Sequence, residues 1–299
     1  MTTTAQYVNP EIARRVARLD LKAKFIVEGF LAGLHDSPYQ GFSLEFSEYR
    51  HYVPGDDPKS LDWAVWAKTD RLFVKTFQAE TNLDAYLLVD TSRSMAYAGA
   101  KGAMTKLEYA TALAAALGYL LTSQRDSVGL GILGSGLERF LPPHATRRQL
   151  VRILAELANA RSGGATRLAA GLHAVAQRVR RRGLMVLLSD LLDEPEEVLQ
   201  AMRHLVFRGH DLVVFQILDA AERNLQISGP VVLADPESGA EVATDADAIR
   251  QSYAERIDAF VGRYEREVRD MGGEFAAMTT STPFDHALVH FLTERKKRF

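Results

Sequence analysis

The chain has 299 residues, of which 47% are hydrophobic and 25% are charged, values that exclude a disordered or fibrous protein. Its formal net charge is −2, so no whole-chain field attracts nucleic acid or an anionic membrane surface, and we expect neither as a partner. The absence of cysteine excludes disulfides, thiolate catalysis and cysteine-ligated zinc.

The N-terminal segment lacks the apolar core that a signal peptide needs. The longest nearly uninterrupted apolar run, from Ala110 to Leu121, is shorter than the roughly 20 residues that span a bilayer. We therefore expect a chain without a membrane span and with a cytoplasmic location.

Residues 1–80 are predicted to form an N-terminal extension that contains both helix and strand. An amphipathic helix begins at Asn9 or Pro10 and extends to about Ala32. Two strand-like runs follow at residues 42–52 and 71–77. The segment between these runs contains Asp56, Trp63 and Trp66. The two tryptophans either anchor the extension on the rest of the chain or, with Asp56, bind a partner.

Residues 81–299 alternate between strand and helix. Apolar runs predict strands at residues 85–89, 127–133, 184–189, 212–218 and 274–278. Helical patterns occur at residues 106–122, 147–160, 167–181, 196–207, 248–270 and 284–297. The strands are apolar throughout, as parallel strands buried on both faces are. This alternation predicts an α/β fold of the Rossmann type, with a doubly wound, mostly parallel sheet.

Two glycine patterns concern the ends of these elements. Residues 129–134 match G-x-G-x-x-G, but a tight turn and another strand at 137–141 are expected to follow. A dinucleotide site needs a helix there, so we do not expect one. Three arginines at 180–182 are expected to end a helix, with Gly183 as its left-handed cap.

Oxygen-bearing side chains follow two of the predicted strands. Asp90, Ser92 and Ser94 come after the first strand, Asp190 follows the third, and Thr166 stands at a helix N-terminus between them. Ligands of open α/β sheets bind at the carboxyl ends of the strands, so these residues are expected to converge. Carboxylate and hydroxyl oxygens suit Mg²⁺, Mn²⁺ or Ca²⁺ rather than zinc or copper.

The expected site would leave a coordination position open. Two carboxylates offset a divalent ion, and an acidic side chain of a partner protein could supply the missing oxygen. Arg93, beside the ion, would favour the same anionic group. We expect the site residues to lie at a loop mouth outside the core, so that replacing Asp90 or Ser92 with alanine leaves the fold intact.

The spacing D-x-S-x-S, with a later threonine and aspartate, resembles the metal-ion-dependent adhesion site of von Willebrand factor A domains. This resemblance implies a von Willebrand factor A-like fold and a metal site formed by the five residues named above. The sequence departs from the commoner pattern at Arg167, where many such domains carry aspartate. Arg93 and Arg167 are therefore candidate contacts for a partner.

A wider resemblance covers the chain from about residue 40 onward. The segments PGDDP, LLVDTSRSM, KLEYA, DSVGL, LSDLLD and GHDLVVFQILD occur in the order found in the bacterial family called domain of unknown function 58. Members of that family are typically encoded beside MoxR-type AAA+ ATPases. The resemblance implies a module that works with such an ATPase as a co-chaperone or assembly factor.

The sequence thus favours metal-dependent protein binding without enzymatic activity. A Mg²⁺-dependent phosphoester hydrolase is an alternative, because it also uses acidic residues at strand ends. An aspartyl phosphatase, however, needs a carboxylate two residues after its nucleophile, where Ser92 stands. A scaffold that binds no metal is the third reading.

Overall fold

The structure is a computed structural model that describes residues 10–35, 49–51, 73–75, 83–100, 103–163, 167–225, 227–234 and 239–298. The chain divides into two compact units, one of residues 1–30 and 83–299 and the other of residues 31–82. Helix α1 (Pro10–His35) crosses this division. In the smaller unit, β1 (Tyr49–His51) and β2 (Phe73–Lys75) pair antiparallel. Both strands lie within the two predicted strand-like runs.

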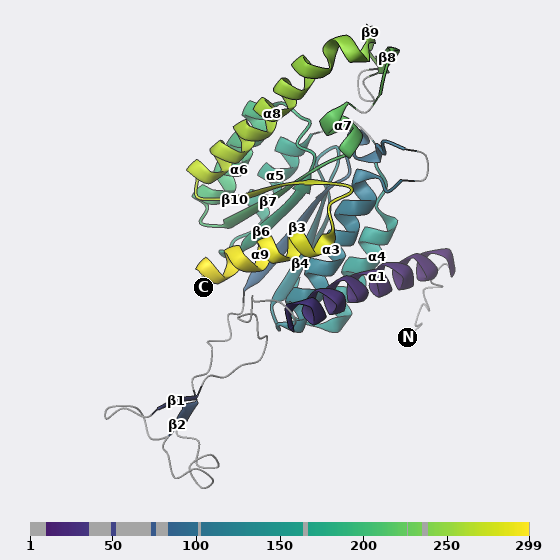
Figure 1. Cartoon of the computed structure of the whole chain (residues 1–299). Helices are drawn as coiled ribbons and strands as arrows, with labels where there is room; N and C mark the ends of the chain where they lie inside the picture. The colour runs from purple at the N-terminus through teal and green to yellow at the C-terminus, as the bar shows by residue number, and fades with distance from the viewer. Residues whose placement is uncertain are drawn as a thin grey trace, which may run out of the picture. The chain divides into compact units, whose positions relative to one another are not determined.

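A six-stranded sheet forms the centre of the larger unit, with the order β10-β7-β6-β3-β4-β5 (Figure 1). Its strands are β3 (Asp84–Asp90), β4 (Ser127–Leu133), β5 (Leu137–His144), β6 (Leu184–Ser189), β7 (Asp211–Leu218) and β10 (Glu274–Thr279). Neighbouring strands are parallel, except that β5 runs antiparallel to β4. The glycine-rich run at 129–134 leads by a tight turn into β5, as predicted. The predicted doubly wound, mostly parallel sheet is confirmed.

Helices cover both faces of this sheet (Figure 1). One face carries α3 (Lys106–Ser123), α4 (Arg147–Asn159) and α9 (Phe284–Arg298), and the other carries α5 (Leu168–Arg178), α6 (Pro195–Phe207) and α8 (Ala246–Asp270). The first part of α1 joins the α3 side, where the ammonium of Lys22 lies 5.3 Å from the centre of the Phe284 ring. Among the helices described, none has the combination of length and hydropathy that crossing a bilayer requires.

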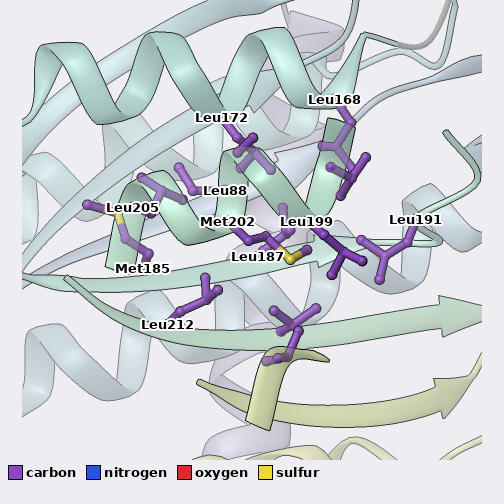
Figure 2. Close-up of a cluster of buried hydrophobic side chains, with 14 of the residues drawn as sticks. Leu88, Leu168, Leu172, Met185, Leu187, Leu191, Leu199, Met202, Leu205 and Leu212 are labelled. Atoms are coloured by element: carbon purple, nitrogen blue, oxygen red, sulfur yellow. The ribbon is translucent and has the colours of Figure 1, made fainter. Parts of the chain in front are cut away.

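Helix α3 is buried along nearly its whole length. Its start is fixed by a capping box, in which the Thr105 hydroxyl accepts the amide of Glu108 at 3.1 Å and the Glu108 carboxylate accepts the amide of Thr105 at 2.9 Å. The opposite face of the sheet packs Leu88 and Leu187 against α5 and α6, including Leu172 (Figure 2). Strands β3 and β6 are therefore enclosed between helix α3 on one face and helices α5 and α6 on the other.

The connection from β7 to β10 contains elements that the sequence analysis did not predict. A short helix, α7 (Ala220–Asn224), follows β7 directly. A hairpin of β8 (Pro230–Ala234) and β9 (Glu241–Asp245) comes next and leads into α8. Another short element, the 3₁₀ helix η2 (Arg93–Ala96), follows β3. Helix α7 and η2 both contribute to the site described below.

Gly183 does not have the predicted left-handed cap role. Helix α5 ends at Arg178, and Gly183 stands just before β6, outside the residues with positive φ. A Cβ atom at Gly183 would lie 2.3 Å from the carbonyl oxygen of Asp84 in the neighbouring strand. The position requires glycine because the backbone just before β6 meets the backbone of β3 there.

Replacing Gly183 with alanine should therefore destabilise the protein by about 1–3 kcal/mol, because two backbone segments must separate. Gly262 within α8 is a matched control, since its added Cβ would meet only the Arg266 side chain at 3.3 Å. Alanine there should stabilise the helix by about 0.5–1 kcal/mol. Urea unfolding of both variants gives the comparison, and equal effects would contradict the close-approach explanation.

Candidate functional site

The candidate site lies where the chain reverses its direction of travel across the sheet. From β3 the chain proceeds to β4 on one side and later returns to β6 on the other side of β3. Val89 pairs with Leu188, so the residues that follow both strands emerge side by side. Such a switch point is where open α/β sheets bind ligands. Asp90 and Asp190 meet here, as the sequence predicted.

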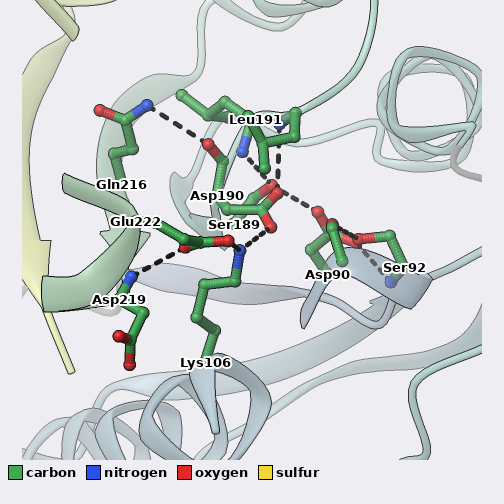
Figure 3. A network of polar contacts seen from close by, with 11 residues as sticks. Asp90, Ser92, Lys106, Ser189, Asp190, Leu191, Gln216, Asp219 and Glu222 are labelled. Carbon is green, nitrogen blue, oxygen red and sulfur yellow. Dashed lines mark hydrogen bonds and ion pairs between the residues drawn. The ribbon is translucent and has the colours of Figure 1, made fainter. Parts of the chain in front are cut away.

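Hydrogen bonds from two serines hold the Asp90 carboxylate (Figure 3). One oxygen, Oδ1, accepts the backbone amide of Ser92 at 2.8 Å, and the other, Oδ2, accepts the hydroxyl of Ser189. The hydroxyls of Ser92 and Ser94 lie 3.0 Å apart and share a hydrogen bond. Three of the predicted oxygen donors are thereby gathered in one place, together with the unpredicted Ser189.

The site residues are buried, and the expectation of an open loop mouth is wrong. Asp90 and Asp190 are 2% and 1% exposed, and Ser92 is fully buried. Ser94 is 5% exposed and lines a cavity of about 420 Å³ whose other walls include side chains of α7, β8 and α8. This cavity therefore borders the site at Ser94.

A buried lysine holds the second carboxylate. The ammonium of Lys106 lies 2.8 Å from Oδ2 of Asp190 and 2.7 Å from Oε1 of Glu222, and the lysine side chain is fully buried (Figure 3). The other Asp190 oxygen accepts the amide of Leu192 at 3.1 Å. Lys106 therefore connects the start of α3 to the end of β6 and to α7.

A further layer of hydrogen bonds fixes α7. Glu222 accepts the amide of Asp219 at 2.9 Å, which completes the capping box of this helix. Asp219 in turn accepts the amide of Ala221 at 2.8 Å and the hydroxyl of Thr280 at 2.7 Å. Glu222, one of the two carboxylates that pair with Lys106, is therefore held by hydrogen bonds that extend through Asp219 to the loop after β10.

The backbone turns sharply after Asp190. Leu191 has a φ of 61°, a left-handed conformation that is uncommon for a leucine. Its amide donates to the Ser189 hydroxyl at 2.9 Å, and its carbonyl accepts the hydroxyl of Tyr264 at 3.3 Å. Strain of this kind persists only where the surroundings over-determine it, and it clusters at functional sites.

The two aspartates repel one another in a buried setting. Burial first, and then the charge of Asp190, raise the pKa of Asp90 to about 7, although hydrogen bonds from Ser189 and Ser92 oppose the change. Burial alone would lower the pKa of Lys106, but the attraction of Asp190 and Glu222 outweighs it and raises the pKa. Near neutral pH, Lys106 is therefore charged, and Asp90 is partly protonated.

The remaining predicted metal ligand, Thr166, lies outside the described residues. The chain on both sides of it is anchored near the strand ends. The amide of Gly163 donates to the carbonyl of Thr91 at 3.0 Å, and the amide of Arg167 donates to the carbonyl of Gly134 at 3.3 Å. Arg167 is exposed and stands at the N-cap of α5. Its role toward a partner stays a prediction.

The other predicted partner contacts have different outcomes. Arg93 is exposed at the start of η2, between the two site serines in sequence. Asp56, Trp63 and Trp66 lie outside the described residues.

Sequence reasoning missed Lys106, Ser189 and Glu222. A signal for Lys106 was present: a lysine in the first turn of a helix is opposed by the helix dipole, and α3 is otherwise almost wholly apolar. A cation in that position needs a carboxylate partner. Glu222 had the capping pattern D-x-x-E with Asp219, which predicts a helix start but not a pairing with Lys106.

The candidate ligands suit a hard cation because they are oxygen atoms, although they carry little negative charge. Among the described residues, no three histidine, aspartate or glutamate side chains gather as a metal cluster. The fit depends on Asp90 together with the Ser92 and Ser94 hydroxyls, all of them oxygen donors. Asp190 is engaged by Lys106 and would support such an ion from a distance. In their described contacts, Asp190 and Glu222 are engaged by a cation, whereas Asp90 is held by amide and hydroxyl donors.

Comparisons with known proteins place the chain in a family. The family described as protein of unknown function DUF58 matches residues 48–260. An uncharacterized protein of Mycobacterium tuberculosis, strain H37Rv, is 30% identical over 294 residues, covering 97% of this chain and 91% of the relative.

Two solved structures are similar at lower levels. The hypothetical protein BatB from Bacteroides thetaiotaomicron is 13% identical, with a TM-score of 0.47 and coverage of 72% of this chain and 99% of BatB. The SpRpn10 VWA domain is 10% identical, with a TM-score of 0.38 and coverage of 69% and 93%. On the sequence matches, this chain belongs to the DUF58 family of proteins of unknown function.

Proposed function

We propose that this protein is a protein-interaction module whose site at the ends of β3 and β6 binds a divalent cation, and through it an acidic side chain of a partner. The observation that carries the proposal is the pairing of Asp90 with Asp190 in a buried site, where Asp90 is held only by amide and hydroxyl donors in its described contacts. Lys106 already pairs with Asp190 and Glu222, so a further cation beside Asp90 would offset the repulsion that remains between the two aspartates.

Each part of the site has a separate task. Asp90, Ser92 and Ser94 would hold the ion, with Thr166 as a further ligand by resemblance. Lys106 fixes the orientation of Asp190 at 2.8 Å. When bound, Mg²⁺ or Mn²⁺ would supply the positive charge that attracts a partner's carboxylate. The cavity beside Ser94 gives that carboxylate a route, and exposed Arg93 adds attraction for it.

The partner follows from the family resemblance. We propose a MoxR-type AAA+ ATPase, with this chain acting as its co-chaperone or assembly factor and without enzymatic activity of its own. Turnover of generic phosphoesters in the presence of Mg²⁺ would instead favour the hydrolase.

Calorimetric titration with Mn²⁺ tests the metal site. Wild-type protein should bind one ion, and Asp90→Ala should weaken binding at least about tenfold, because the ion loses its charged ligand. Asp193→Ala is the matched control: this neighbouring carboxylate accepts the amide of Leu168 at 3.0 Å, outside the donor set. No heat from folded wild type at millimolar ion would overturn the proposal.

A binding assay tests the partner. Co-purification of the wild type with a MoxR-type ATPase from the same genome should be abolished by EDTA and by Asp90→Ala, and retained by Asp193→Ala. A complex that survives both treatments docks elsewhere on the chain.

A further inference from the structure

A second surface of the larger unit has the properties of a docking site. A cavity of about 840 Å³ is lined by α1, the start of α3, the end of α4 and the segment that follows it. It is separate from the cavity beside Ser94 and has no lining residue in common with it. We name it the basic groove, and its cationic lining residues are Arg15, Arg18, Lys22 and Arg161.

The charges of the basic groove are unbalanced. Four cations face one lining carboxylate, Glu108, which is already engaged in the capping box with Thr105. Among the described side chains, no carboxylate forms an ion pair with any of the four cations. Arg161 donates to the carbonyl of Ala160 at 3.1 Å, and Lys22 lies 3.9 Å from the sulfur of Met104. Such a surface attracts an anionic partner.

The lining beneath these cations is aliphatic. Leu19, Leu107 and Leu157 contribute to it, and the latter two are buried. A ligand that matches both parts must carry apolar groups between its negative charges. The described lining includes no aromatic ring on which a nucleobase could stack. An acidic peptide with interspersed aliphatic side chains matches the groove better than a nucleotide does.

We infer that the basic groove binds an acidic, leucine-containing peptide segment of a partner protein. This binding is independent of the proposed metal site, because none of the groove residues belongs to the donor set. The two surfaces are nevertheless linked along the chain. Ser162 lines the groove, and the next residue, Gly163, donates to Thr91 beside Asp90 at 3.0 Å. A partner could thus engage both surfaces together.

Fluorescence anisotropy tests the inference with a fluorescein-labelled peptide of alternating glutamate and leucine and the full-length protein in EDTA. Arg18→Glu and Arg161→Glu reverse exposed charges on two different segments that line the groove, α1 and the residues after α4. Each should weaken binding at least about tenfold, since each removes a charge-assisted contact and adds repulsion. Lys24→Glu is the control, because Lys24 is exposed on the same helix but lies outside the groove lining.

The expected pattern is binding that falls with added salt and is unaffected by Asp90→Ala. The same peptide with glutamine at each glutamate should bind at least about tenfold more weakly. The inference is overturned if wild type does not bind the acidic peptide, if the glutamine peptide binds equally well, or if Lys24→Glu weakens binding as much as the groove variants. Tighter binding of a single-stranded oligonucleotide than of the peptide would also overturn it. Circular dichroism confirms that each variant is folded.

Discussion

Replacing Lys106 with methionine should destabilise the protein by about 3–5 kcal/mol, the usual cost of removing one partner from a buried ion pair. The lysine is fully buried between Asp190 and Glu222, so its loss leaves two carboxylates facing each other without a cation. Methionine preserves the length and apolar stem of the side chain, so the change tests charge rather than volume. Urea unfolding at neutral pH measures the difference in the free energy of unfolding.

An exposed lysine provides the matched control for this prediction. Lys24 pairs with Glu28 at 3.5 Å on α1, where both side chains are more than half exposed. Lys24→Met should change the free energy of unfolding by less than about 0.5 kcal/mol. Neutralising the stranded carboxylates in the triple variant Lys106→Met, Asp190→Asn, Glu222→Gln should restore part of the lost stability. A loss below about 1 kcal/mol in Lys106→Met alone would contradict the central role of this pair.

Asp90→Asn should stabilise the metal-free protein, and the gain should grow with pH. Folding raises the pKa of Asp90 to about 7, so the folded state binds this proton more tightly than the unfolded state does. The stability that the protonated form contributes is full below the unfolded pKa and is lost as the pH rises through 7. Asparagine stays neutral, and its amide oxygen can still accept the hydrogen bond from the amide of Ser92.

The measurement is unfolding in EDTA at pH 5 and pH 8. The gain of Asp90→Asn over wild type should increase by roughly 2–3 kcal/mol between these values, from about 1.4 kcal/mol per pKa unit. Millimolar Mg²⁺ at pH 8 should then stabilise the wild type and leave the variant unchanged, because only the wild type keeps the charged ligand. A gain in stability that does not depend on pH would contradict the raised pKa of Asp90.

Much of the fold follows from local pattern. The central parallel strands β3, β4, β6 and β7 are nearly continuous apolar runs, and the start of α3 has a complete capping box at Thr105. The meeting of Asp90 and Asp190 was also predictable, because parallel strands place their carboxyl ends at one edge. Position along a strand therefore carried information about position in space.

The contacts that complete the site have no such local pattern. Lys106 and Glu222 are 116 residues apart, and Ser189 and Asp90 are 99 apart. The helix that carries Glu222 has only five residues, too few for a hydrophobic period to show. Gly183 was misjudged because glycine signals both a left-handed cap and a close approach of two backbones, and only tertiary structure separates these.

These long separations have a consequence for the order of events during synthesis. Contacts between distant residues form after local ones, because closing a long loop is entropically costly. Lys106 emerges from the ribosome well before Asp190 and Glu222, so its charge stays in water until the later half of the sheet has assembled. The ion pairs that orient Asp190 therefore belong to the finished molecule alone. A partner that requires this site would recognise only chains whose folding has reached α7.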